Sequence, residues 1–496
     1  MYRLDNRVLW EDETITANLA VNILKYGIPG GDDGTNRLLF NSAADLNKDS
    51  VWVYSPWLSE YLTAASFAVF GKNEFAARLP FAVLGFLSVI FLFYVVLDIF
   101  KDKQLALITL LLSITSEVLI LHSRQCKYYT IAIFMQILFI YAFHLLIGRK
   151  RVGIVCMAIA LTAQFYSNYM FVPGNMLLAM AAAFMLRKKY PGLLFDLFIA
   201  SGIVSVFALA WVLYAALWNQ AGLVGLSSYY EKLIFYLIEI NMTMFPLLLL
   251  LLPVFFRKSE FIINAGSKEM LFFIIAIIPF QLSFTINFYL FFIRYIIVLI
   301  PVFIILQALI LRKTPFLLRY TLLCVLCFTN VIGYAAVLPF KNLLIPHTRL
   351  ELQKLRFPVK DILIERLTPY VNRSEELIAF LNENAQPGQT LLAQDSEFPV
   401  IFYTKLKVLD INYIKTQPSE FPDWIFTQSV SGINEYLGGK SFDTGAYSEF
   451  LRQNYVPVII KVHNSKVGGS IPDPDLYEYV TSANKIQFLV FKKKPR

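Results

Sequence analysis

Ten long apolar segments dominate the chain between residues 80 and 338. A helix needs about 20 residues to cross the hydrocarbon core of a bilayer, and most of these segments approach or reach that length. The segments are 80–99, 104–121, 128–147, 152–168, 170–186, 194–218, 234–255, 270–288, 291–311 and 318–338. Because 57% of the residues are hydrophobic and only 16% are charged, against about 25% charged in a soluble domain, no single globular core could bury this much apolar surface. The sequence therefore predicts an α-helical polytopic membrane protein.

The apolar segments divide the chain into three predicted parts. Residues 1–79 form an external acidic segment, residues 80–339 a transmembrane domain of about ten helices, and residues 340–496 an external water-soluble domain. In the last part, TLLAQ, DWIFTQ, YVPVIIKV and IQFLVFKKK are typical of short strands, and NRSEELIAFLNEN is typical of a helix. The C-terminal domain is therefore expected to be α/β.

Positive charges in the short loops predict the orientation. Of the 18 Lys and Arg residues in the short loops, 14 lie in one set of loops, near positions 101, 150, 188, 258 and 313. The alternate set holds only Arg124, Lys127, Lys232 and, at a helix end, Arg294. The positive-inside rule places the first set in the cytoplasm. We therefore expect the N-terminal segment and the C-terminal domain both to face the non-cytoplasmic side. The overall character of the sequence favours a bacterial cytoplasmic (inner) membrane, in which that side is the periplasm.

The first apolar segment begins only at residue 80, so an external segment of 79 residues precedes it. Such a segment normally needs a signal peptide or a membrane helix to carry it across. A membrane helix upstream of Met1 is the favoured interpretation. Translocation of the segment behind the first span is the alternative.

An acidic cluster opens an amphipathic helix near the N-terminus, in WEDETITANLAVNILKYGIP. Glu11, Asp12 and Glu13 precede an apolar stripe at helical spacing, and Gly27 and Pro29 are typical of a helix end. The stripe consists of Ile15, Leu19, Ile23 and Leu24. This pattern predicts a helix lying in the membrane interface.

VWVYSPWLSEYLTAASFAVFG predicts a second interfacial helix. Ser55 suits its N-cap, Pro56 its first helical position, and Gly71 its end. Its amphipathic aromatic residues, which suit the headgroup layer, are Trp52, Tyr54, Trp57 and Tyr61.

Little in the sequence points to metal or redox chemistry. The four Cys and the four His are scattered, and Cys324 and Cys327, although spaced as CxxC, lie inside an apolar segment. The net charge of +9 reflects the loop pattern rather than binding of nucleic acid. No cofactor is required by these residues, and participation of a divalent metal is left open.

Several stretches, taken in order, resemble the GT-C superfamily of membrane glycosyltransferases. They are WEDETITANLAVNILKYGIP, SPWLSEYLTAASFAVFGKNEFAARLPF, HSRQCKYYTIAIF and FIRYIIVLIP, followed by PGQTLLAQDSEFPVIFY and PDWIFTQ in the C-terminal domain. Each stretch is short and degenerate, but their order covers most of the chain. The branches that look most similar are protein O-mannosyltransferase-like and aminoarabinose-transferase-like. In these families a membrane helix precedes the acidic segment.

The resemblance implies an inverting glycosyltransferase. The donor would be a sugar on dolichyl or undecaprenyl phosphate, and the acceptor a hydroxyl of a protein, lipid or glycan. The reaction needs a carboxylate to accept the hydroxyl proton and cations around the departing phosphate.

The family's acidic pair maps onto Asp12 and Glu13, with Asp12 as the general base. From the residues alone, Asp12 as an N-cap and Glu13 as a first-turn charge is the simpler interpretation. The structural and the catalytic interpretations are both correct if Glu13 stabilises the helix while Asp12 acts as the general base.

Arg124, Lys127 and Arg294 are the predicted phosphate-binding residues. Arg124 and Lys127 lie in the outer loop HSRQCKYY, where a basic side chain beside Tyr128 could also simply reach the membrane surface. Arg294 lies among aromatic residues near the outer end of an apolar segment, where a cation needs a partner. A lipid phosphate is the natural partner, and Glu117 or Glu239 is the alternative.

Glu74, Glu117, Glu239 and Tyr128 are predicted to support the site. Glu117 and Glu239 lie near the outer ends of apolar segments, where a carboxylate is either functional or held in a structural pair. Glu74 either lines the site or is a solvated charge. Asp196 and His144 lie near cytoplasmic ends and are not included.

Two other function classes stay open. A lipid-sugar transporter or flippase would carry ionisable groups at mid-membrane and repeated halves, whereas the charges here gather at the outer ends. A non-enzymatic sensor or scaffold would leave the acidic helix and Arg294 without a role. The sugar, the acceptor and the oligomeric state are not determined by these patterns.

Overall fold

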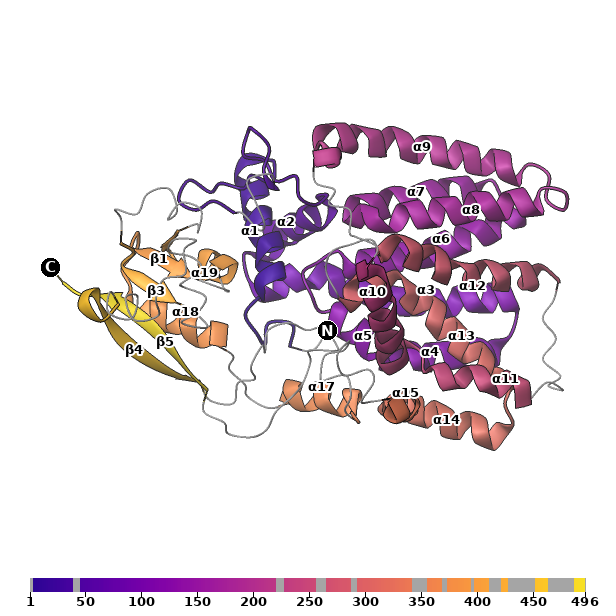
Figure 1. Ribbon diagram of the computed structural model, residues 1–496. Helices are drawn as coiled ribbons and strands as arrows, with labels where there is room; N and C mark the ends of the chain where they lie inside the picture. The colour runs from indigo at the N-terminus through magenta and orange to yellow at the C-terminus, as the bar shows by residue number, and fades with distance from the viewer. Residues whose placement is uncertain are drawn as a thin grey trace.

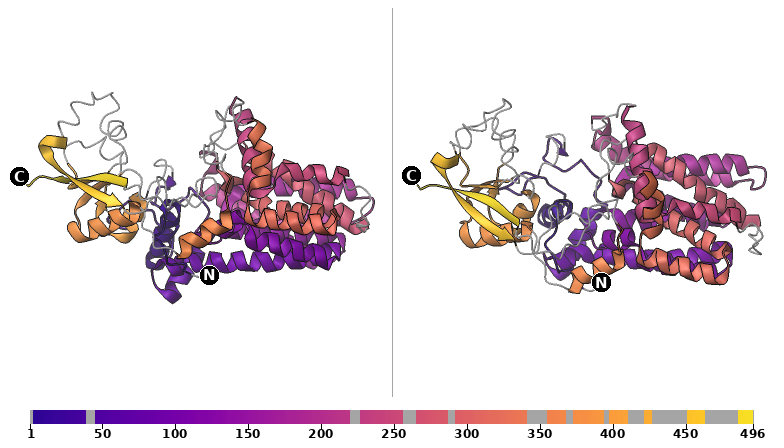
Figure 2. Two further views of the ribbon diagram at one scale, coloured as in Figure 1. Left: turned by 90° about the horizontal axis from the view of Figure 1, so that it is seen from below. Right: turned by 60° about the horizontal axis from the view of Figure 1, so that its bottom comes forward.

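The computed structural model consists of a long helical bundle with a smaller, sheet-containing domain at one end (Figure 1). The structure describes residues 3–38, 45–219, 227–255, 265–286, 292–340, 355–367, 373–393, 397–409, 421–426, 451–462 and 486–495. The N-terminal segment lies between the bundle and the sheet (Figure 2). This arrangement puts the acidic cluster at the junction of the two domains.

The N-terminal segment contains the two expected helices, α1 (Glu11–Tyr26) and α2 (Leu58–Phe70). Gly27 ends α1 at φ 81° and Gly71 ends α2 at φ 78°, and glycine adopts this left-handed region without a Cβ clash. Helix α2 starts later than predicted, because Ser55 accepts a hydrogen bond from the Trp52 indole instead of capping the helix.

Helix α1 does not lie openly in a membrane interface. Ile15, Leu19 and Ile23 of its predicted stripe are buried, whereas Leu24 is 51% exposed. Trp52, expected in the headgroup layer, is only 1% exposed. The reason is that α2 and the C-terminal domain cover α1, which turns an amphipathic helix into part of a protein core.

The bundle runs from α3 to α15. Its helices are α3 (Glu74–Phe100), α4 (Lys103–Thr115), α5 (Glu117–His122), α6 (Tyr129–Ile147), α7 (Val152–Asn168), α8 (Val172–Leu186), α9 (Leu193–Tyr214), α10 (Ser227–Glu239), α11 (Leu252–Phe255), α12 (Ala265–Thr285), α13 (Ile300–Lys313), α14 (Phe316–Phe328) and α15 (Val331–Val337). Short helical turns connect several of them, including Tyr169–Phe171 before α8 and Ile293–Leu299 before α13.

Among the described residues, six helical stretches have the length and composition to cross a membrane, with residues 152–186 counted as one, or up to eight if each of two bent pairs is one span. This differs from the ten expected spans. Residues 104–121 are divided at Ser116, and α4, with 13 residues, reaches only about 20 Å. The segments 234–255 and 318–338 each contain a bend of 84°. Apolar composition alone does not reveal such breaks. The join between the eighth and ninth predicted spans, residues 287–291, lies outside the described residues.

Residues 152–186 form one apolar stretch in which α7 and α8 are distinct. Asn175 of α8 donates a hydrogen bond to the side chain of Gln164 in α7 over 2.9 Å. In a continuous helix, residues this far apart would be separated by about 16 Å along the axis. The chain therefore changes direction at Tyr169–Phe171, close to the predicted boundary at residue 169.

The C-terminal domain is α/β, as expected. Its helices are α17 (Pro358–Leu367), α18 (Arg373–Asn384) and α19 (Glu397–Tyr403), and its strands are β1 (Thr390–Ala393), β2 (Lys407–Val408), β3 (Trp424–Phe426), β4 (Tyr455–Val462) and β5 (Ile486–Lys493). The sheet order is β2-β1-β3-β5-β4. Strand β1 pairs parallel with β2 and β3, and β5 pairs antiparallel with β3 and β4. The four predicted strands are confirmed, whereas β2 was not predicted.

Helix α19 and the residues that follow it connect this domain to the N-terminal segment through hydrogen bonds. Asn18 of α1 donates to the Phe398 carbonyl over 3.2 Å, and Lys72 donates to the Phe402 carbonyl over 2.8 Å. The side chain of Asn36 donates to the Leu406 carbonyl and accepts from the Val408 amide, at 3.1 and 2.7 Å. The C-terminal domain thus supports α1 directly.

Asn36→Ala is expected to loosen this junction, because it leaves a buried carbonyl and a part-buried amide without their partner, at a cost of about 1–3 kcal/mol. Hydrogen exchange at the Val408 amide, which loses its acceptor, should become faster. Asn384→Ala, which removes an exposed side-chain contact on α18, is the matched control. Equal exchange in the two variants would contradict a supporting role for Asn36.

Candidate active site at the N-terminus of α1

Asp12 and Arg294 meet across 282 positions of the sequence. Arg294 Nη1 donates to Asp12 Oδ2 over 2.8 Å. The side chain of Asp12 is 15% exposed and that of Arg294 is 11% exposed, so the pair is largely shielded from water. Asp12 lies in the first turn of α1, and Arg294 lies in the turn Ile293–Leu299 that leads into α13. The two predicted site residues are therefore brought together at the end of the bundle.

Aromatic rings surround the Arg294 guanidinium. Its central carbon lies 4.1 Å from the ring centroid of Phe292 and 5.6 Å from that of Trp10. A cation over an aromatic face is attracted by the ring's negative π-surface. The two rings hold Arg294 in place and reduce its contact with water.

Lys127 brings a second cation to the same end of α1. Its Nζ donates to the Asp12 backbone carbonyl over 3.2 Å and lies 3.5 Å from Thr16 Oγ1. Lys127 belongs to the loop at residues 123–128, between α5 and α6. Asp12 is thus flanked by one cation from this loop and one from the start of α13.

Tyr128, predicted as a supporting residue, lies in this cluster. Burial raises the pKa of its phenol well above the ordinary range, and Tyr295, Arg294 and Asp12 all act on it electrostatically. A protonated phenol in this position can donate a hydrogen bond but carries no charge. The cluster therefore combines one carboxylate, two cations and a neutral phenol.

Glu13 has a different environment from Asp12. Its carboxylate, 1% exposed, accepts from Arg78 Nε at 2.8 Å and Arg78 Nη2 at 2.7 Å. It also accepts from the backbone amides of Cys126 and Trp10, at 2.8 and 3.2 Å. Four donors occupy its two oxygens, so Glu13 joins α1 to α3 and to the 123–128 loop.

The N-cap of α1 is Trp10, not Asp12. Glu13, at the third helical position, accepts the Trp10 N–H in the manner of the carboxylate of a capping box. The capping interpretation is therefore wrong for Asp12, whose side chain points instead to Arg294. The prediction that Glu13 stabilises the helix while Asp12 has a different role agrees with this geometry.

Arg78 is a central residue that the sequence interpretation missed. Besides Glu13, it donates to the carbonyls of Leu4 and Arg7 through Nη1 and of Val8 through Nη2, at 2.8–3.1 Å. One guanidinium thus organises the chain that leads into α1. Arg78 lies just before the first predicted apolar segment, but α3 begins already at Glu74 and therefore contains it, and an arginine in an apolar helix needs partners.

The remaining predicted residues lie at the edges of the cluster or elsewhere. Arg124 donates to the Arg3 carbonyl over 2.6 Å, so it contacts the N-terminal segment. Glu74 lies at the start of α3 beside Tyr403 of α19, where it contributes with burial to raising the pKa of that tyrosine. Both residues therefore contact segments that lie next to α1.

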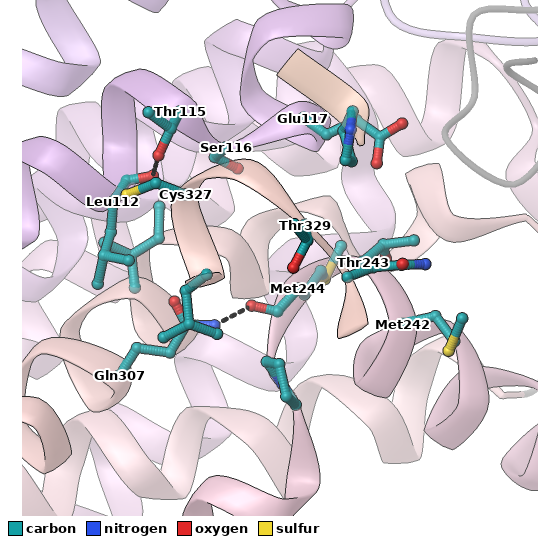
Figure 3. Close-up of a pocket in the computed structure, with 15 residues that line it drawn as sticks. Leu112, Thr115, Ser116, Glu117, Met242, Thr243, Met244, Gln307, Cys327 and Thr329 are labelled. Carbon is teal, nitrogen blue, oxygen red and sulfur yellow. Dashed lines mark hydrogen bonds between the residues drawn. The ribbon is translucent and has the colours of Figure 1, made fainter. Parts of the chain in front are cut away.

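Glu117 belongs to a second polar cluster and pairs with Arg356. It lines a cavity of about 70 Å³ together with Ser116, Thr329 and Asn330 (Figure 3). Ser116 separates α4 from α5, and Thr329 and Asn330 separate α14 from α15. Broken helices at membrane depth require polar surroundings for their backbone groups, and this cavity provides them.

Glu239, fully buried at the end of α10, lies beside Tyr236. Tyr236 is in turn close to Tyr295, the neighbour of Arg294. Tyr236 and Tyr295 therefore lie between Glu239 and the Asp12 cluster. Within the ranges that the structure describes, no three His, Cys, Asp or Glu side chains gather in a way that could hold a metal ion.

Arg78→Met is expected to destabilise the protein by about 3–5 kcal/mol, because it leaves the Glu13 carboxylate buried without its counter-charge. Thermal unfolding in detergent would measure the loss. Lys101→Met, which breaks the exposed pair with Asp98, should cost less than about 1 kcal/mol. The double variant Glu13→Gln/Arg78→Met should recover part of the loss. Similar stability of the two single variants would contradict the role given to Arg78.

Comparisons with known proteins agree with the predicted resemblance. Residues 55–218 match a family model described as dolichyl-phosphate-mannose-protein mannosyltransferase. No curated protein matches the sequence significantly. The fold is similar to that of ArnT from Cupriavidus metallidurans, solved bound to undecaprenyl phosphate, with a TM-score of 0.53 at 12% identity over 98% of this chain and 95% of that one. The apo structure of the same ArnT gives the same TM-score and identity, over 98% and 94%. The family match and the shared fold support the resemblance, and this chain is a polytopic membrane protein with an ArnT-like fold.

Proposed function

We propose that this protein transfers a sugar from a polyprenyl-phosphate donor to a hydroxyl acceptor. The contact between Asp12 and Arg294 is the observation that carries the proposal, because it holds a carboxylate and a cation together where the reaction needs both. The match to a dolichyl-phosphate-mannose mannosyltransferase model and the ArnT structure bound to undecaprenyl phosphate support this donor class.

Arg294 and Lys127 would bind the donor phosphate. A guanidinium forms directional hydrogen bonds to phosphate oxygens, and an ammonium adds a point charge. Both cations adjoin Asp12, so a phosphate between them would place the sugar's anomeric carbon near that carboxylate. As negative charge grows on the departing phosphate, the two cations would stabilise the transition state.

Asp12 would act as the general base. The acceptor hydroxyl attacks the anomeric carbon from the face opposite the phosphate and loses its proton to Asp12. The bond between the anomeric carbon and the phosphate oxygen breaks, and its electron pair leaves with the polyprenyl phosphate. The configuration at the anomeric carbon is inverted. These steps use only side chains of this protein, and a divalent metal is not needed for them.

The site would face the external, periplasmic side of a bacterial inner membrane. The loop-charge pattern supports this orientation, and the C-terminal domain lies at the same end of the bundle as α1 (Figure 2). That domain also contacts α1 through α19. It is well placed to influence which hydroxyl-bearing acceptor, whether protein, lipid or glycan, reaches Asp12.

Asp12→Asn is expected to lower the rate of sugar transfer by about 10²–10⁴-fold, because asparagine keeps the shape but accepts no proton. Transfer of radiolabelled sugar from a panel of polyprenyl-phosphate donors in proteoliposomes would measure it. Glu11→Gln, one residue earlier, is the matched control and should retain transfer close to native. Equal loss in both variants would count against Asp12 as the base, and full transfer by Asp12→Asn would exclude it.

The proposed orientation can be tested by cysteine labelling. A membrane-impermeant maleimide applied to intact spheroplasts should label Glu383→Cys, in the C-terminal domain, and should not label Lys150→Cys, in a positively charged loop. Both positions are exposed in the structure, so their reactivity depends on the side of the membrane. The native protein reports background labelling. The reverse pattern would place the site in the cytoplasm.

A further inference from the structure

Helix α2 presents a polar face to the loop that carries Lys127. Glu60 and Thr63, one turn apart, are both buried on this face. Thr63 Oγ1 lies 3.2 Å from Cys126 Sγ, and Cys126 directly precedes Lys127. The other side of the same loop contacts α1, through Glu13 and the Asp12 carbonyl. The loop is therefore held between α1 and α2.

Glu60 is a buried carboxylic acid with an incomplete set of hydrogen bonds. It is 2% exposed, and its Oε2 has no hydrogen-bond partner among the described residues. Burying an ionised carboxylate in this way is costly. Burial raises the pKa of Glu60 to about 7, although the nearby Lys127 ammonium lowers it. Glu60 can thus change its charge near neutral pH.

We propose that Glu60 is a positioning residue that sets how much of the Lys127 charge is available to the phosphate of a lipid phosphodiester. This inference rests on the proposed function of the Asp12 site. When Glu60 is ionised it neutralises Lys127, and when it is protonated the Lys127 charge is left for the phosphate. Glu60 acts through Lys127 and does not need to touch the donor.

Other titratable groups lie on the elements that pack against α2. Of the side chains on the helices that pack against α2, Glu13 of α1 pairs with Arg78 of α3, and Asp12 of α1 pairs with Arg294. The loop contributes Cys126, whose thiol pKa is raised by burial, so it stays neutral. Helix α7, which also packs on α2, carries Cys156 and Tyr166 and no acidic or basic side chain. Lys127 is the charge that acts on Glu60.

The sign of the pH dependence follows from these charges. Below the pKa of about 7, Glu60 is neutral and the site attracts an anion more strongly. Above that pKa, Glu60 is negative and binding of an anion weakens. By linkage, an anion that binds beside Lys127 must raise the pKa of Glu60 and cause proton uptake.

The test measures binding of undecaprenyl methyl phosphate to the native protein in nanodiscs between pH 6 and 8.5. This phosphodiester keeps a single negative charge over that range and carries no sugar, so neither its own titration nor sugar specificity affects the result. The dissociation constant of the native protein should rise about five- to tenfold across the range. The Glu60→Gln variant should bind as tightly at pH 8.5 as at pH 6.

Two control variants separate titration from packing. Thr63→Val disturbs the same contact between α2 and the loop but leaves the carboxylate, so its pH dependence should match the native one. Glu383→Gln removes an exposed carboxylate on α18 and should also match the native protein. A pH dependence that persists in Glu60→Gln, or is lost equally in Thr63→Val, would overturn the inference.

A second measurement needs no variant. Calorimetric titration of the native protein in two buffers of different ionisation enthalpy should reveal proton uptake on binding, largest near pH 7. Binding without proton uptake would overturn the role of Glu60 and leave the proposed function standing. No binding of the phosphodiester at any pH would overturn the proposed function and this inference together.

Discussion

Arg78 and Glu13 meet in a buried ion pair, and the geometry around Asp12 depends on it. Their two charges are taken out of water, which is favourable only because nearly every donor and acceptor finds a partner. Glu13 accepts four hydrogen bonds, and Arg78 donates to three backbone carbonyls as well as to Glu13. Helix α1, the start of α3 and the 123–128 loop are thereby held in one arrangement. This arrangement contributes to holding Lys127 at the backbone of Asp12.

The neighbouring charges are arranged quite differently. Asp12 has a single-point contact with Arg294, and both side chains keep some exposure. A pair that is partly solvated can exchange partners more easily than one that is fully enclosed. Two adjacent acidic residues therefore have different environments, because the side chain of Glu13 is fully enclosed and that of Asp12 keeps some exposure. Glu60 is buried near Lys127, and in its proposed role its carboxylate adds a charge that depends on pH beside that ammonium.

Several features could be predicted from the sequence because they depend on local composition. The membrane domain follows from the length of the apolar segments, and the strands of the C-terminal domain follow from short β-rich runs between polar stretches. The end of α1 follows from Gly27, and the pairing of a charged residue at position 294 with some partner follows from the cost of an isolated cation among apolar residues. These are properties that a window of neighbouring residues already contains.

Other features were decided only by the tertiary structure. The breaks at Ser116 and at Thr329–Asn330 depend on the polar cavity between distant helices, and Trp52 is buried because α19 covers α1. The sequence indicated Asp12 and Arg294 as candidates, but it could not show that they touch each other, or that Glu13 is closed off by Arg78. The physical reason is that hydrophobic length and helix ends are local, whereas the partner of a buried charge is chosen by how segments far apart in the chain pack together.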